Sequence, residues 1–434
     1  MMDAKIFFND IYKSQDQPND LLKAFQQKNW NSFSELDLPS VKHEEWKYTR
    51  IKNVFTEAIQ YNQDKTDFSE EELSKVKLPG TANANSLVFI NGIYQPHLST
   101  LTDGSDRLII KSLSEASTDE DADFVNEHLG CSNAYHPDGI NALNGSFAAH
   151  GLFIKVKKGK ELSQPIVIYH FSDSRSGFRF SQPRILVSIE ENTIATIIET
   201  YHKIGNHQSL TNEVVEICVE KAAHFRYIKI QNEGTDSNHT GTTQINQLGK
   251  STAHAVTISL SGEIVRNNLN MVMRAEFCES HMYGLYLLGG KSQVDNHTIV
   301  DNAMPNCLSN ELYKGIMDDN STGIFNGKIF VRKDAQKTNA YQSNKNILLG
   351  QNSSANTKPQ LEIFADDVKC SHGCTIGKLD EDALFYLRAR GISEQNAKAL
   401  LLHAFAADIL QQIELEELRN YIDSLISERL TITI

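Results

Sequence analysis

Short runs rich in β-branched residues follow one another between about Gly151 and Cys370. Apolar and polar residues alternate within each run, as in RILVSIE, TIATIIET, EVVEICVE, HFRYIKI, TTQINQL and HAVTISL. A period of two predicts β-strands. No amphipathic pattern of ten or more residues separates the runs, which argues against alternating strand and helix units. The span is therefore predicted to be all-β, as a solenoid, a sandwich or a barrel.

The spacing of these runs favours the solenoid. Polar turns followed by small residues recur at EENTIATII, EKAAHFRYI, GKSTAHAVT and ESHMYGLYL. Aligning Ala195, His224, His254 and His281 gives steps of roughly 27 to 30 residues, a period expected of a solenoid. Histidines at three equivalent positions raise the idea of a metal site, but stacked or solvent-facing side chains of a β-helix explain them more simply.

A helical pattern and a hairpin precede this span. Leu, Phe and Trp recur at helical spacing in DLLKAFQQKNWNSF. A polar stretch broken by Pro79 and Gly80 predicts a linker or surface excursion at 63–85. The segment SLVFINGIYQPHL then predicts a strand pair that turns at Asn91 and Gly92.

Helical patterns return after Gly377. A first helix is predicted from Asp380 to Gly391, and a second opens at Ser393. The predicted apolar stripe of the second helix consists of Leu400, Leu401, Ala404, Phe405 and Ile409. A third helix is predicted at about 415–430. We therefore predict three regions: an N-terminal helical region with its linker at 1–85, a β-helix core with its entry strands at 86–377, and a C-terminal helical domain at 378–434.

Composition excludes several classes of partner. The formal net charge is -13 at pH 7 and no basic cluster offsets it locally, so nucleic acid is not expected as a partner. No apolar run approaches the ~20 residues that cross a bilayer, so no membrane partner is expected. The 6 cysteines follow a start, MMDAKIFFND, without an apolar signal core. We expect reduced thiols and a cytoplasmic location.

Common catalytic motifs are absent from the sequence. Gly290, Lys291 and Ser292 resemble the end of a phosphate loop, but position 285 is Leu instead of Gly and a strand pattern follows, so no ATP site is expected on this chain. Adjacent carboxylates such as Asp318 and Asp319 would point to opposite faces of a strand, which indicates turns rather than a general acid and base.

The stretch VKCSHGCTIG carries the candidate metal ligands. If it continues the last strand, the side chains of Cys370, His372 and Cys374 project from one face, and Gly373 lets another backbone approach. Zinc and iron–sulfur clusters favour thiolate and imidazole ligands, and three donors leave room for one from elsewhere. The alternative is structural, because a cysteine is frequently a small buried hydrophobe.

Several long stretches then allow a family to be named. They are KHEEWKYT, ALNGSFAAHGLFIKVKKG, RNNLNMVM, GLYLLGGKSQVDNHTIVDNAMPNCLSNELYKGIMDDNSTGIFNGKIFVRKDAQKTNAYQSNKNILLG and NTKPQLEIFADDVKCSHGCTIGKLDEDALFYLRARGIS. Together they resemble the SufB/SufD family of the SUF system for iron–sulfur cluster assembly, and within it the SufD branch. The resemblance covers the chain from about Lys42 to the C-terminal helices.

This resemblance implies a fold and a set of partners. The implied fold is mainly β, a right-handed parallel β-helix flanked by N-terminal and C-terminal α-helical domains. The implied role is that of a non-catalytic scaffold, which pairs with SufB, binds the SufC ATPase through its C-terminal helical region and supports iron acquisition and cluster assembly. Homodimers are also implied as possible assemblies.

The resemblance also implies roles for particular residues. Cys370 and His372 match the family's K-C-S-H-G motif, which is thought to lie at the SufB interface near a transient iron or nascent cluster shared with SufB. Many SufD sequences have Ala at the position of Cys374, so Cys374 is predicted as an auxiliary ligand from its chemistry alone. The segment 380–413 is predicted to dock the ATPase through ALFYLRARG, by way of Leu384, the aromatic Phe385 and Tyr386, and the basic Arg388 and Arg390.

Two alternative identities remain at this stage. A SufB-type paralogue is usually longer and lacks K-C-S-H-G at this point. A β-helix polysaccharide lyase or hydrolase is typically secreted and needs converging Asp, Arg or Lys side chains. One further expectation concerns assembly: a parallel β-helix ends in unpaired backbone groups, so the end of the solenoid near EIFADDV and Cys370 is predicted to pair with a partner.

Overall fold

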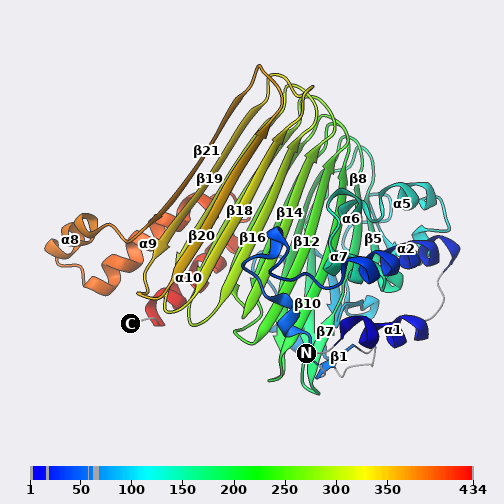
Figure 1. Cartoon of the computed structure of the whole chain (residues 1–434), viewed down its shortest axis with the longest axis horizontal. Helices are drawn as coiled ribbons and strands as arrows, with labels where there is room; N and C mark the ends of the chain where they lie inside the picture. Colours follow the sequence, from blue (N-terminus) through cyan, green and yellow to red (C-terminus); the bar gives the residue numbers. More distant parts are fainter. Residues whose placement is uncertain (1–2, 16–18, 57, 62–67, 433–434) are drawn as a thin grey trace.

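The computed structural model describes residues 3–15, 19–56, 58–61 and 68–432. Its centre is a stack of parallel coils, and consecutive strands of a coil belong to two different sheets (Figure 1). The first sheet follows the order β20 (Ser354–Ile363), β18 (Thr322–Val331), β16 (Gln293–Asn302), β14 (Ile264–Met273), β12 (Ser237–Gln247), β10 (Ser209–Val219), β8 (Arg184–Ile189), β5 (Leu152–Val156) and β4 (Leu108–Ser112), with β7 (Phe178–Ser181) and β1 (Ile59–Gln60) off this path.

The second sheet lies opposite the first. Its order is β21 (Lys369–Gly377), β19 (Asn339–Leu348), β17 (Leu308–Met317), β15 (Glu279–Leu288), β13 (Thr252–Ser261), β11 (His224–Asn232), β9 (Ile194–Ile204), β6 (Ile166–Asp173), β2 (Asn85–Ile90) and β3 (Ile93–Tyr94). The predicted hairpin is confirmed, because β2 and β3 pair antiparallel around Asn91 and Gly92, whose φ angles are 52° and 83°. The predicted parallel β-solenoid with helices at both ends of the chain is confirmed as well.

The solenoid repeat is regular in structure but not in length. His254 pairs with His281, and their rings stack with centroids 4.4 Å apart. His224 is not equivalent to them, since it pairs with Thr252, and Arg226 occupies the position facing His254. The predicted equivalence of three histidines is therefore wrong for His224. The turns between strands differ in length, so a fixed step cannot define the register.

Most helices of the N-terminal half cover the outer face of the first sheet at its early coils (Figure 1), whereas Leu73 of the short helix at 70–74 shares a core with the second sheet. Asn19 caps the helix that follows it through a bond from the Leu22 amide. The described part of the predicted linker at 63–85 contains a short helix and a turn at Gly80, and 63–67 lie outside the described residues. The helices are α1 (Ala4–Ser14), α2 (Asp20–Leu36), α3 (Glu70–Ser74), α4 (Leu113–Ala116), α5 (Ala122–His128), α6 (Cys131–Tyr135) and α7 (Gly139–Gly145).

Three helices follow the solenoid, as predicted. They are α8 (Glu381–Ala389), α9 (Glu394–Leu410) and α10 (Glu416–Ile432). Asp380 and Ser393 cap α8 and α9, and Gly391 has a φ of 88° between them. Of the helices in the described ranges, none is long and apolar enough to cross a membrane.

The apolar face of α9 differs from the predicted stripe. Leu400 is 51% exposed and Ala404 is exposed, whereas Ile409 is buried as predicted. Leu402, Ala406, Ile409 and Leu410 join a core that includes residues of the second sheet. Helices α9 and α10 therefore cover the sheet, and only α8 has no buried residue.

Candidate functional site

Both sheets end in an edge strand at the same end of the solenoid. Among the described residues, β20 pairs with β18 alone and β21 with β19 alone, so one side of each strand is unpaired. We call β20, β21 and the turn between them the open coil. Its residues are mostly half-buried or exposed, and Ile363, Phe364 and Ile376 are 40%, 58% and 49% exposed. Apolar side chains beside unpaired backbone are typical of an edge that another chain covers.

The predicted ligand residues lie along the inner face of this open coil. Cys370 is half-buried and packs against the core inside the solenoid, and its register partner is the buried Ala340. His372 and Cys374 alternate with it on the same face and are exposed, because no further coil covers them. Burial raises the pKa of the Cys370 thiol.

These three side chains do not form a closed metal site by themselves. A strand rises ~3.3 Å per residue, so Cys370 and Cys374 start ~13 Å apart, and one ion cannot bridge them without a change of backbone. Within the ranges that the structure describes, no group of three or more His, Cys, Asp and Glu side chains is placed to hold a metal ion. The adjacent pairs Cys370 with His372, or His372 with Cys374, remain close enough to act together.

Two buried polar residues, Gln342 and Glu311, lie in register with His372 on the two preceding coils, and we call them the buried polar row. The register partner of His372 in β19 is Gln342, whose partner in β17 is Glu311. Gln342 Nε2 donates to Glu311 Oε2 at 2.7 Å, while Gln342 Oε1 and Glu311 Oε1 find no hydrogen-bond partner among the described residues. Burial raises the pKa of Glu311 to about 7. Sequence reasoning missed this row, since neither residue belongs to a motif.

The residues predicted to dock a partner gather on α8. Phe385 and Tyr386 are 73% and 56% exposed, and the Arg390 guanidinium lies 4.7 Å from the centre of the Tyr386 ring. Arg388 is exposed, and Leu384 is half-buried. Leu384, Phe385 and Arg388 line a groove of about 890 Å³ between α8, α9 and the turns that follow β15 and β19. The structure thus presents these side chains at the surface.

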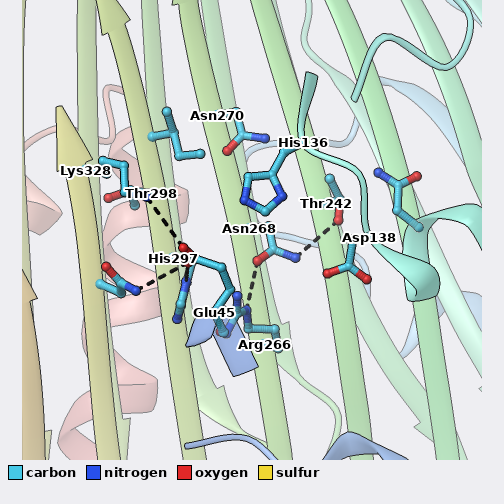
Figure 2. Close-up of a pocket in the computed structure, with 13 residues that line it drawn as sticks. Glu45, His136, Asp138, Thr242, Arg266, Asn268, Asn270, His297, Thr298 and Lys328 are labelled. Carbon is cyan, nitrogen blue, oxygen red and sulfur yellow. Dashed lines mark hydrogen bonds and ion pairs between the residues drawn. The ribbon is translucent and has the colours of Figure 1, made fainter. Parts of the chain in front are cut away.

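The KHEEWKYT motif lies elsewhere, across the outer face of the first sheet. Figure 2 shows Glu45 reaching to His297, whose Nδ1 is 3.2 Å from Glu45 Oε2. The hydrogen bond with His297 lowers the pKa of Glu45 to about 2, although burial opposes the shift. Trp46 stacks on Arg266, with the guanidinium 4.5 Å from the ring centre, and donates to Asp138 at 2.7 Å.

This second polar cluster serves the fold. Its cavity holds about 30 Å³, room for a water molecule but not for a metabolite. Glu45 also approaches Asn326 and Lys328, both at 3.5 Å. The motif therefore ties the N-terminal segment to β14, β16 and β18, and the open coil is the better functional candidate.

Comparisons with known proteins decide the family. Residues 5–168 match the SufBD protein N-terminal region, and residues 170–405 match the SufBD core domain of the SUF system for FeS cluster assembly. The chain belongs to the SufBD family.

Individual SufBD proteins align along most of the chain. An iron–sulfur cluster assembly SufBD family protein of Synechocystis is 32% identical over 406 residues, which cover 91% of this chain and 88% of the relative. The iron–sulfur cluster assembly protein SufD of Escherichia coli is 30% identical over 395 residues, which cover 91% and 89%. The chloroplastic protein ABCI7 of Arabidopsis thaliana is 30% identical over 311 residues, which cover 70% and 65%.

Membership of the SufBD family replaces the polysaccharide-enzyme alternative. The family links this fold to iron–sulfur cluster assembly.

The phosphate-loop fragment is a tight turn, with Gly290 at a φ of 61° and β16 beginning at Gln293. Asp319, with a φ of 52°, accepts from the Gly290 amide at 2.7 Å, so this carboxylate stabilises a turn as predicted.

Proposed function

We propose that this chain is a non-catalytic scaffold of a cytoplasmic SUF complex, in which its open coil pairs with a SufB-type chain. The observation that carries the proposal is the edge strand β21, which pairs with β19 on one side and carries Cys370 and His372 on its inner face. The two side chains form an incomplete ligand set at an edge. A ligand set completed by a partner suits a site that must release its cargo, because closed four-ligand sites hold their metal tightly.

The cargo in this proposal is iron or a nascent iron–sulfur cluster. His372 offers an imidazole and Cys370 a thiol, and Cys374 is an auxiliary thiol further along the strand. ATP would be hydrolysed by a SufC-type subunit, since this chain offers no phosphate-binding loop. No disulfide joins any of the 6 cysteines in the structure, so their thiols are available as ligands.

The ligand role predicts a loss of cargo without a loss of assembly. We expect the double variant Cys370→Ser with His372→Ala, co-expressed with its SUF partners and purified without oxygen, to contain several-fold less iron and sulfide. The complex should keep its subunit ratio and melting temperature, because both positions lie at an edge. Ser371→Ala, on the opposite face of β21, is the matched control. Equal cluster content in the double variant would contradict the ligand role, and a complex that falls apart would point to packing.

The edge role predicts sensitivity to proline at outward-facing amides. The Lys369 amide donates to the Thr338 carbonyl at 2.9 Å, so alternation directs the amide of Ile376 away from β19. Ile376→Pro should leave the ladder to β19 intact and weaken association with the SufB-type chain by about tenfold or more. Ile376→Ala, which keeps the amide, is the control.

Size-exclusion chromatography and equilibrium binding would measure this effect. Association of the proline variant at the affinity of the alanine variant would exclude pairing through β21. The second candidate assembly is a homodimer through the same edge. Size-exclusion chromatography of the isolated Ile376→Pro variant tests it, because both chains of such a homodimer would lack the outward-facing amide.

The ATPase-docking role is best tested by substitution in α8. Removing everything after Gly377 would also uncover the apolar outer face of the second sheet, since α9 and α10 share a core with it. Phe385→Asp should instead reduce binding of a SufC-type ATPase by about thirtyfold or more, the range of interface hot spots. Ile6→Asp, at a 69% exposed position of α1, is the control. Titration calorimetry with the purified ATPase would measure both, and full affinity in the Phe385 variant would refute the assignment.

A further inference from the structure

Two cysteines stack at one corner of the solenoid, away from the open coil. Cys278 precedes β15 and Cys307 precedes β17, and both are buried. The Leu308 amide donates to the Cys278 carbonyl at 3.0 Å, just as the Glu279 amide donates to the Ser251 carbonyl at 2.9 Å. Cys278 and Cys307 therefore occupy the same position on adjacent coils. The equivalent positions on successive coils hold small residues: Thr193, Ala223, Ser251, Cys278, Cys307 and Thr338.

Both thiols at this corner point along the stack toward the preceding coil, and Cys278 Sγ lies 3.3 Å from the carbonyl oxygen of Gly249, so a bond to Cys307 needs a rotation of the Cys278 side chain. The preceding residues, Phe277 and Asn306, both have left-handed φ angles, of 59° and 61°. Cys307 Sγ lies 3.4 Å from the carbonyl oxygen of Ala275, which belongs to the coil of Cys278. The Cys307 thiol thus points along the stack toward Cys278, and both residues belong to the same core.

The spacing of the coils suits a covalent link. Neighbouring strands of a sheet lie ~4.8 Å apart, and disulfides join residues whose Cα atoms are ~4.4–6.8 Å apart. The thiols also lie next to the surface, because Phe277 is 51% exposed. Cys278 and Cys307 are themselves 0% and 1% exposed, so a peroxide molecule reaches them only when this turn opens.

We propose that Cys278 and Cys307 are a reversible dithiol–disulfide pair that a hydroperoxide oxidises. The hydrogen bond with Cys307 lowers the pKa of Cys278 to about 7, so Cys278 is the nucleophile. Its thiolate attacks one peroxide oxygen, the O–O bond breaks, and hydroxide leaves and takes up the proton released by the thiol. The Cys307 sulfur then attacks the resulting sulfenic acid and expels a second water. Two thiols and one hydrogen peroxide become one disulfide and two waters.

A thiol reductant reverses the reaction by exchange through a mixed disulfide. The link would join β15 and β17, the strands on which α9 packs. The proposal is independent of the ligand role of Cys370, because it concerns a different corner and needs no metal.

Peptide mapping of the folded, full-length protein tests the pair directly. The reduced chain is treated with hydrogen peroxide, quenched, denatured and alkylated, and the digest is analysed by mass spectrometry. We expect a cross-linked peptide pair containing Cys278 and Cys307 in most molecules, and its loss after incubation with dithiothreitol. Cys218, a buried thiol whose pKa burial raises, should stay reduced, and the exposed Cys374 reports that peroxide was effective.

A Cys307→Ser variant adds a trapping experiment. Without its partner thiol, Cys278 should accumulate sulfenic acid that dimedone labels, whereas the wild type should show little label there. The proposal is overturned if Cys374 is oxidised while Cys278 and Cys307 both stay reduced, if Cys278 is oxidised in the wild type without the cross-link, or if the cross-link appears only after denaturation.

Discussion

Replacing Lys229 by Met is expected to lower the free energy of unfolding by about 3 to 5 kcal/mol, the usual cost of removing one partner from a buried ion pair. Lys229 projects into the solenoid from β11 and forms an ion pair with Glu213 of β10. Both side chains are almost completely buried. Methionine has nearly the same length and no charge, so the variant tests the charge rather than the packing.

The cost follows from the surroundings of Lys229. His239 lies 3.0 Å from Glu233 and 3.3 Å from Glu213. Burial alone would raise the pKa of Glu213, but the Lys229 ammonium and His239 hold it well below its usual range. A third carboxylate, Glu199, accepts hydrogen bonds from Tyr201 and Tyr227. Removing the ammonium would leave three buried carboxylates beside two imidazoles: His170, 3.3 Å from Glu199, and His239, whose pKa Glu233 and Glu213 raise against burial.

A double variant separates the charge imbalance from other effects. Lys229→Met combined with Glu213→Gln removes one charge of each sign, so we expect it to recover much of the lost stability. Urea unfolding followed by circular dichroism would give both free energies at pH 7. A single variant within about 0.5 kcal/mol of the wild type, the range of ordinary surface substitutions, would show that the cluster does not need the ammonium.

The strands of this cluster were predictable from sequence, but its position inside the protein was not. EVVEICVE and HFRYIKI alternate with the period of a strand, and both form strands, β10 and β11. Alternation of apolar and polar residues suggests a strand with one buried face and one solvent-exposed face. In β10, however, all 11 residues are buried, because helix α7 covers the outer face while the second sheet covers the inner one. A period-two alternation of apolar and polar residues cannot show which face of a strand points into the solenoid when both faces are covered.

The same limit explains what was and was not predicted at the ends of the chain. Asp380 and Ser393 act through local hydrogen bonds, so the starts of α8 and α9 followed from residue type. The buried face of α9 depends instead on the sheet beneath it. Leu402 is buried and Leu400 is exposed, although the two residues are equally apolar. Only the packing of the helix decides between them.

The candidate site divides in a similar way. Cys370 and His372 belong to one short motif, so their common face on β21 could be derived from alternation. Gln342 and Glu311 come from the two preceding coils and meet His372 only through register. A sequence without known coil lengths cannot place them.

Glu311 provides the second large effect, which depends on pH. Its side chain is buried in β17, and burial raises its pKa from 4.5 to about 7, against the hydrogen bond from Gln342. The folded state therefore keeps the carboxyl protonated where the unfolded chain has already lost the proton. The contribution of Glu311 to the free energy of unfolding is therefore fully present below pH 4.5, the pKa in the unfolded chain, and is lost as the pH rises through about 7, the pKa in the folded protein. The difference between the two pKa values corresponds to about 3 kcal/mol.

Glu311→Gln should remove this loss, because the amide has the same shape and no charge. Its carbonyl oxygen can accept from Gln342 Nε2, and its amide can donate to Gln342 Oε1, which has no partner in the parent protein. We expect wild type and variant to be about equally stable at pH 4.5 and the variant to be more stable by up to about 3 kcal/mol at pH 8. Glu381→Gln, on the exposed surface of α8, is the control. Urea unfolding at both pH values cancels all other titrations between variant and parent, so a constant difference across the range would show that Glu311 is already ionised in the folded protein.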